Sequence, residues 1–114
     1  MAERFEMNGR YAQMVVAGKT IYIAGQIANN YDGDIRQQTQ EVLTKLDRLL
    51  EQAGASKKHL VSCTVWIKDF ADYGAYNEVW QRWVDPNELP ARASVGAPLL
   101  DPRLRIEIAA VAVK

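Results

Sequence analysis

The alternation of apolar and polar residues along the chain predicts five β-strands. Two short apolar runs flank Gly18 and Lys19, and a Gly-X pair between such runs is typical of a two-residue hairpin turn of type II′. Between residues 60 and 67, β-branched residues alternate with polar ones, and another short strand candidate lies between Pro90 and Pro98. The predicted strands cover residues 12–17, 20–26, 60–67, 92–97 and 104–113.

The longest periodic segment runs from residue 34 to residue 53 and predicts an α-helix. Asp34 can cap its first turn, and Gly54 stands where a helix usually ends. The apolar residues of this segment recur at the three- and four-residue spacing of one helix face. They are Ile35, Val42, Leu46, Leu49 and Ala53, with Leu43 and Leu50 beside them.

A second helix is predicted to begin near Asp69 and to end before Pro86. Aromatic residues form a wide face along it, namely Phe70, Tyr73, Tyr76, Trp80 and Trp83. The resulting element order is β-β-α-β-α-β-β. We therefore expect an α+β fold, a mixed β-sheet with two helices on one face.

The last predicted strand is apolar on both sides near its C-terminal end. Ala109, Val111 and Val113 lie on the side opposite Ile106 and Ile108. Strands that are apolar on both sides are normally buried on both sides, and helices on one face leave the other face open. We therefore expect a second subunit to cover this side. The alternative is that Val111 and Val113 are merely exposed near a frayed end.

Length, charge and hydropathy narrow the classes of protein that this chain can be. A chain of 114 residues and 12.8 kDa favours a single domain over residues 1–114. Lys and Arg number 14, as do Asp and Glu, and this zero net charge disfavours a nucleic-acid-binding protein. No signal-like segment or run of the ~20 apolar residues needed for a membrane span is present. We expect a soluble cytoplasmic protein without nucleic-acid or membrane partners.

The chain has one cysteine and one histidine, which excludes an internal disulfide and a Cys/His zinc site within one chain. Cys63 lies in a predicted buried strand with no cation nearby in the sequence, so it is interpreted as a small core residue. His59 follows Lys57 and Lys58 in a polar segment and is interpreted as a solvated loop residue. Neither a P-loop nor a GxGxxG pattern is present.

Two charged residues stand out because they lie in predicted strands. Arg92 and Ser94 alternate on one side of a short strand, and Glu107 lies within the apolar terminal strand. An unpaired buried charge costs several kcal/mol, so such residues either pair with each other or serve a site. The spacing leaves both interpretations open: an Arg92–Glu107 ion pair across neighbouring strands, or a functional pair.

Several short sequence motifs along the chain together match the pattern of a known protein family. The most specific are the block Pro90-Ala91-Arg92-Ala93-Ser94-Val95 and the terminal strand from Ile106 to Val113. Weaker matches are residues 9–13, 24–27, 34–39 and 65–72, and Asn77. With these segments the chain resembles, along nearly its whole length, the Rid family of reactive-intermediate deaminases. This family is also called YjgF and carries the older label endoribonuclease L-PSP.

The resemblance implies a fold, an assembly and an activity. It implies a chorismate-mutase-like, YjgF-type subunit that forms a homotrimer with outward-facing helices and a cleft at each subunit interface. It also implies hydrolysis of 2-imino and 2-enamino acids, such as 2-iminopropionate and 2-aminoacrylate, to the 2-keto acid and ammonia, without a metal or another cofactor. The chain departs from the family pattern at Ala24, often serine, at Ser94, often cysteine, and at Ala109, often a second glutamate.

The same resemblance assigns roles to individual residues. Arg92 would hold the substrate carboxylate through two parallel hydrogen bonds, and Glu107 would orient or deprotonate the attacking water. Further residues implied to contact the substrate are Tyr11, Gly25, Asn77 and Ser94. Two alternatives remain: a carboxylate-binding module of the same fold without turnover, and a ribonuclease or translation inhibitor, which the balanced charge disfavours.

Overall fold

A computed structural model describes all residues from Met1 to Lys114. The elements in chain order are β1 (Ala2–Met7), β2 (Ala12–Ala17), β3 (Thr20–Gln26), α1 (Ile35–Gln52), β4 (Leu60–Ile67), α2 (Tyr73–Trp83), β5 (Ala91–Gly96) and β6 (Ile106–Val113). Short 3₁₀ turns precede β4 and α2. None of the helices combines the length and the apolar character that crossing a membrane requires.

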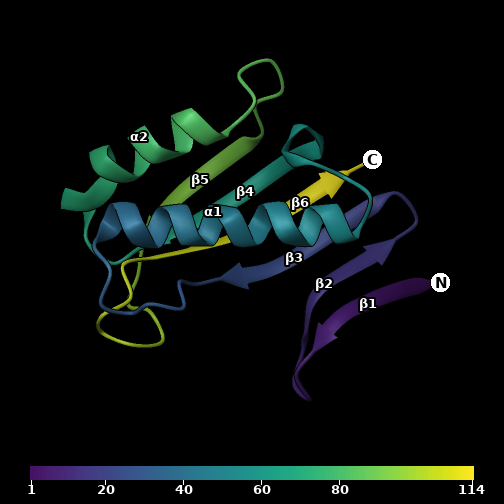
Figure 1. Cartoon of the computed structure of the whole chain (residues 1–114), viewed down its shortest axis with the longest axis horizontal. Helices are drawn as coiled ribbons and strands as arrows, with labels where there is room; N and C mark the ends of the chain where they lie inside the picture. The colour runs from purple at the N-terminus through teal and green to yellow at the C-terminus, as the bar shows by residue number, and fades with distance from the viewer.

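The strands form one six-stranded sheet in the order β1-β2-β3-β6-β4-β5. Only β4 and β5 pair in parallel, and every other neighbouring pair is antiparallel. Both helices lie on the same side of the sheet (Figure 1). The predicted α+β fold with a mixed sheet is confirmed. The predicted type II′ hairpin turn is also confirmed, because φ is +61° at Gly18 and negative at Lys19.

The structure corrects the predicted element order by adding a strand, β1, at its start. Its alternation is weak, because only Phe5 packs against the core and the remaining side chains are exposed. Charged residues such as Arg4 are typical of edge strands, where they discourage pairing with other chains. The strand therefore carries little of the hydrophobic pattern from which the other strands are predicted.

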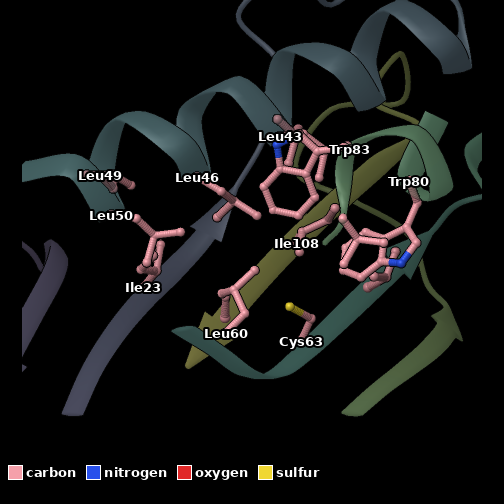
Figure 2. Packing of buried hydrophobic residues seen from close by; sticks show 14 of the residues in the cluster. Ile23, Leu43, Leu46, Leu49, Leu50, Leu60, Cys63, Trp80, Trp83 and Ile108 are labelled. Carbon is pink, nitrogen blue, oxygen red and sulfur yellow. The ribbon is translucent and has the colours of Figure 1, made fainter. Parts of the chain in front are cut away.

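The core lies between the sheet and the two helices. Cys63, Val65 and Ile67 of β4 point toward the helices, as do alternate residues of β6. Leu46 of α1 and Trp83 of α2 fill the space above them (Figure 2). Burial of this continuous apolar layer stabilises the fold by roughly 25 cal/mol for each Å² of apolar surface removed from water.

Local signals set the ends of α1 as the sequence predicts. The Asp34 carboxylate accepts a hydrogen bond from the Gln37 backbone N–H at 2.9 Å, and the Gln37 side chain accepts one from the Asp34 N–H. This reciprocal capping box satisfies two backbone donors that a helix start leaves free. At the other end, Gly54 adopts a φ of +71°, which stops the helix with no steric cost.

The start of β6 is held by a buried glutamine. The Gln38 amide donates to the carbonyls of Gly33 at 2.9 Å and Arg103 at 3.0 Å. Its oxygen accepts from the Arg105 backbone N–H at 2.8 Å. These bonds draw the backbone before β6 toward α1, so the strand begins at Ile106 instead of at residue 104 as predicted. They also fix the backbone two residues before Glu107.

The face of the sheet opposite the helices has no cover within the chain. Tyr22 and Val113 are 51% and 44% exposed there, and Val111 lies beside Tyr22, its register partner on β3. The predicted two-sided character of the terminal strand is therefore present in the structure. We refer to this surface, formed around Val15, Tyr22, Trp66, Glu107, Val111 and Val113, as the open face.

Candidate active site

Arg92 lies on β5 and points to the helix side of the sheet. Its register partner on β4 is Cys63, which belongs to the core, and paired residues of neighbouring strands share a face. The guanidinium carbon lies 5.0 Å from the ring centre of Tyr76 and 5.2 Å from that of Trp80. Both distances are within the ~6 Å range of cation–π attraction. Aromatic rings of α2 thus hold the arginine in place.

The guanidinium of Arg92 pairs with no carboxylate of its own chain. The ion pairs of the chain involve Arg36, Arg48, Arg103 and Arg105 instead. Its polar contact is with the hydroxyl of Tyr73, which lies 3.3 Å from Nη2. An arginine in this state keeps its N–H fork available for an external anion, which it can bind through two hydrogen bonds.

Two further predicted residues lie beside Arg92. Asn77 is one turn after Tyr73 on α2, and its hydrogen bond, together with the Arg92 charge, lowers the pKa of the Tyr73 hydroxyl. Ser94, two residues after Arg92 on the same side of β5, lies 3.0 Å from the hydroxyl of Tyr76, oxygen to oxygen. The structure therefore brings Arg92, Ser94 and Asn77 together around the aromatic side of α2.

Glu107 occupies a separate place, on the open face of the sheet. Its register partner on β4 is Trp66, which alternates with the core residues Val65 and Ile67 and so faces away from the helices. Partial burial raises the pKa of the Glu107 carboxyl, and no charged or hydrogen-bonding neighbour within the chain counters this shift. Such a carboxyl holds a proton more readily than an exposed one, as a general base near neutral pH requires.

Gly25 makes room for the Glu107 side chain. It lies where the β3–β6 register shifts between Ile23 and Gln26, in an irregularity of the strand. A Cβ atom at Gly25 would come within 2.1 Å of Glu107 Oε2, so any larger residue would force the Glu107 side chain out of its present position. The glycine and the carboxylate therefore form a matched pair on the open face.

The structure does not unite all of the predicted residues within one chain. Arg92 and Glu107 lie on opposite faces, and β4 separates their strands. The ion pair considered from the sequence is therefore absent, because it assumed neighbouring strands. Tyr11 lies at the β1–β2 hairpin, 55% exposed, at the other end of the strand order from β5.

The interpretation of Cys63 as a core residue is confirmed, whereas His59 is half-buried in a 3₁₀ turn instead of lying in a solvated loop. Cys63 is 1% exposed and its burial raises the pKa of the thiol to about 12, so the reactive thiolate is disfavoured. The Nδ1 atom of His59 accepts a hydrogen bond from the Ser56 backbone N–H at 3.0 Å in the turn before β4. Both residues have local structural roles.

The aromatic residues around Arg92 are the part of the site that the sequence analysis did not assign. Tyr73, Tyr76 and Trp80 appeared in it only as an apolar helix face. The signal that could have found them is their spacing of three and four residues, which stacks their rings along one side of a helix. Their nearness to Arg92 depends on α2 crossing over β5, which local sequence does not encode.

A polar hollow of about 550 Å³ lies elsewhere, among the loops around Tyr31, Lys68 and Arg103. Both of its arginines already pair with aspartates of the hollow: Arg103 Nη1 lies 3.4 Å from Asp32 Oδ1, and Arg105 Nη1 lies 3.0 Å from Asp72 Oδ2. The hollow contains neither Arg92 nor Glu107. It is therefore separate from the candidate site.

Known proteins resemble this chain over nearly its full length or all of it. The profile of the family described as Endoribonuclease L-PSP matches residues 1–114. A RutC family protein of Haemophilus ducreyi is 33% identical over 108 residues, which are 95% of this chain and 92% of that protein. A 2-iminobutanoate/2-iminopropanoate deaminase of Dermatophagoides farinae is 32% identical over 111 residues, 92% of this chain and 86% of that protein. The crystal structure of a YjgF family member from Neisseria meningitidis is 35% identical with a TM-score of 0.97, covering 100% of this chain and 95% of that one.

Proposed function

The chain belongs to the Endoribonuclease L-PSP family, which includes the YjgF and RutC proteins, and on this premise we propose that it hydrolyses 2-imino and 2-enamino acids to 2-keto acids and ammonia. The observation that carries the proposal is the Arg92 guanidinium, held by aromatic rings and free of any carboxylate partner. The deaminase name of the Dermatophagoides farinae relative supports the same reaction class.

Arg92 would bind the carboxylate that every 2-imino acid carries. A guanidinium presents two parallel N–H groups that match the two oxygens of a carboxylate, whereas an ammonium presents a point charge. Because the polar contact of this guanidinium is the neutral Tyr73 hydroxyl, no internal ion pair has to break before a substrate binds. Asn77 and Ser94 lie beside the arginine and would complete the binding of the same substrate.

Glu107 would activate the water that attacks the substrate. In the reaction, water adds to the carbon of the C=N bond, and the resulting carbinolamine loses ammonia to give the ketone. A carboxylate within hydrogen-bond reach can take the proton of the attacking water and return it to the departing nitrogen. The raised pKa of Glu107 suits both steps, because it brings the carboxyl closer to neutral pH than an exposed glutamate.

A complete site would need two chains. Arg92 and Glu107 cannot meet in one chain because they lie on opposite faces of the sheet. We propose that the open face packs against neighbouring chains in a homotrimer, so that Glu107 and Gly25 of one chain approach Arg92 of another. Tyr11, on the exposed hairpin, would reach the same cleft.

The activity can be tested with imino acids made in place. An amino-acid oxidase generates each 2-imino acid from a panel of amino acids, and semicarbazide traps the imine that escapes hydrolysis. We expect the protein to lower semicarbazone formation in proportion to its concentration, with equal release of ketone and ammonia. Unchanged trapping across the whole panel would contradict the proposal.

A second function is favoured by the separation of the two charged residues. Arg92 with its aromatic contacts is complete within one chain and could bind a carboxylate without Glu107. In that case the protein would be a carboxylate-binding module without turnover. Binding of pyruvate in the absence of imine hydrolysis would identify it.

A further inference from the structure

Tyr76 contacts both polar residues of β5 that belong to the candidate site. It is fully buried on the side of α2 that faces β5. Its ring centre lies 5.0 Å from the guanidinium carbon of Arg92, and its hydroxyl oxygen lies 3.0 Å from Oγ of Ser94. One rigid side chain thus sets the position of an arginine with its ring and of a serine with its hydroxyl.

A second arginine of the chain shows why an aromatic contact differs from an ion pair. Arg103 stacks on Tyr31 at 5.1 Å, almost the distance found at Arg92, but it also binds Asp101 through Nε at 3.0 Å. The acidic partner occupies part of its N–H fork. At Arg92 the rings of Tyr76 and Trp80 attract the cation, and Nη2 contacts only the neutral Tyr73 hydroxyl at 3.3 Å. No acidic group therefore occupies its N–H fork.

The hydrogen bond between Tyr76 and Ser94 has a preferred direction. Either hydroxyl could donate at this distance. Because a phenol is a stronger acid than an aliphatic alcohol and therefore the better donor, we assign the donor role to the Tyr76 O–H. Burial raises the pKa of Tyr76, and the phenol keeps its proton. The serine oxygen is then the acceptor, and its own single hydrogen is left for another group.

We propose, on the basis of the proposed function, that Tyr76 is a positioning residue that prepares a three-donor site for the substrate carboxylate. Its ring holds the Arg92 guanidinium without neutralising it, and its hydroxyl turns the Ser94 hydroxyl hydrogen outward. The carboxylate receives two N–H groups from Arg92 and one O–H from Ser94. Tyr76 touches no substrate itself and acts through these two residues.

The experiment measures kcat and KM for imine hydrolysis, the Kd for pyruvate as a stable 2-keto acid, and the Tm of each variant. Tyr76→Phe keeps the ring and removes the hydroxyl, Ser94→Ala removes the acceptor, and Tyr76→Leu removes the ring. The matched control is Tyr31→Leu, which removes an arginine–tyrosine stack of nearly equal distance outside the site. We expect it to leave kcat and KM at wild-type values.

We expect Tyr76→Phe to raise KM and the pyruvate Kd by roughly 2- to 10-fold, the effect of one hydrogen bond, with kcat and Tm close to wild type. Ser94→Ala should raise both at least as much, because it removes the bond to Tyr76 and also the O–H that reaches the carboxylate. Adding Tyr76→Phe to Ser94→Ala should change little, because the Tyr76 hydroxyl acts only through Ser94. Tyr76→Leu should raise KM more than Tyr76→Phe does, because it removes the ring as well as the hydroxyl. If the ring positions Arg92, the phenylalanine variant must therefore bind substrate better than the leucine variant.

The outcomes separate this proposal from the proposed function. If the wild type hydrolyses imines and the variants Tyr76→Phe and Ser94→Ala keep its KM and pyruvate Kd, the positioning role is wrong and the proposed function stands. Fully additive effects of the two changes would also contradict the role. If the wild type binds pyruvate without hydrolysing imines, and the variants weaken that binding as expected, the positioning role stands and the deaminase proposal fails.

Discussion

The two faces of the sheet differ far more in their cover than in their composition. On one face, α1 and α2 bury a continuous layer that includes Leu46, Ile108 and Trp83. On the other, Tyr22 and Val113 remain exposed although they belong to the central strands β3 and β6. The comparison shows that the fold is complete without the open face. Its apolar residues are therefore available for assembly.

The same comparison separates the charged residues. Arg92 lies on the covered face, where aromatic residues of its own chain hold it. Glu107 lies on the open face, where it has no polar partner and where Gly25 leaves space for it. Changes at Arg92 should therefore act mainly on ligand binding, whereas changes around Glu107 should also depend on what covers the open face.

The largest effect is expected from a charge in the middle of the open face. Val111→Asp should prevent assembly and abolish imine hydrolysis, because an unpaired carboxylate cannot be buried between chains. Light scattering should then give 12.8 kDa instead of about three times that mass. Thr44→Asp, on the exposed side of α1, is the matched control and should keep the assembly. A wild type that is a stable monomer at micromolar concentration would contradict the expected interface.

The next effect concerns the arginine on the covered face. Arg92→Lys should keep the charge and most of the stability but lose the two-pronged geometry, lowering kcat/KM by roughly tenfold to a thousandfold, or ~1.4–4 kcal/mol. The loss should appear mainly as weaker capture of imino acids in the trapping assay. An unchanged Tm shows that the fold is intact. Normal imine clearance by this variant would remove Arg92 from the site.

Glu107→Gln tests the catalytic role of the carboxylate on the open face. Turnover should fall while pyruvate binding persists, because an amide can hold a water but accepts a proton poorly. Normal clearance of imines by this variant would contradict a catalytic Glu107.

The same variant should change how stability depends on pH. Burial raises the pKa of folded Glu107, so its contribution to stability is fully present below the ordinary pKa of glutamate and is lost as pH rises through the folded pKa. Glu107→Gln should therefore melt slightly higher than wild type at about pH 8, with the difference vanishing near pH 4. Melting curves at the two pH values test this. A lower Tm for the variant at pH 8 would show that the carboxylate is stabilised instead.

The smallest effects are expected at Cys63 and His59, which have no role in binding the carboxylate at Arg92 or in activating water at Glu107. Cys63→Ser and His59→Ala should each keep imine hydrolysis within a few-fold of wild type. Cys63→Ser should cost some stability, because it places a hydroxyl in the core below the helices. A hundredfold loss of activity with a native Tm in either variant would show that the site has been misplaced.

The sequence by itself determined the elements whose information is local. The 3.6-residue period and the caps at Asp34 and Gly54 are enough for α1, since a helix closes its hydrogen bonds within one segment. The strand from Leu60 to Ile67 has the predicted bounds because its alternation matches one buried face. The apolar open side of β6 could also be read from its alternation.

Only the tertiary structure decided which residues meet. Strand order is set by pairing between distant segments, and the placement of β4 between β5 and β6 puts Arg92 and Glu107 on strands that do not touch. The bond from Tyr76 to Ser94 likewise exists only because α2 folds back over β5. Local periodicity fixes the face on which a side chain lies, whereas the energy of packing distant segments fixes its neighbours. A site made of such neighbours becomes visible only when the chain is folded.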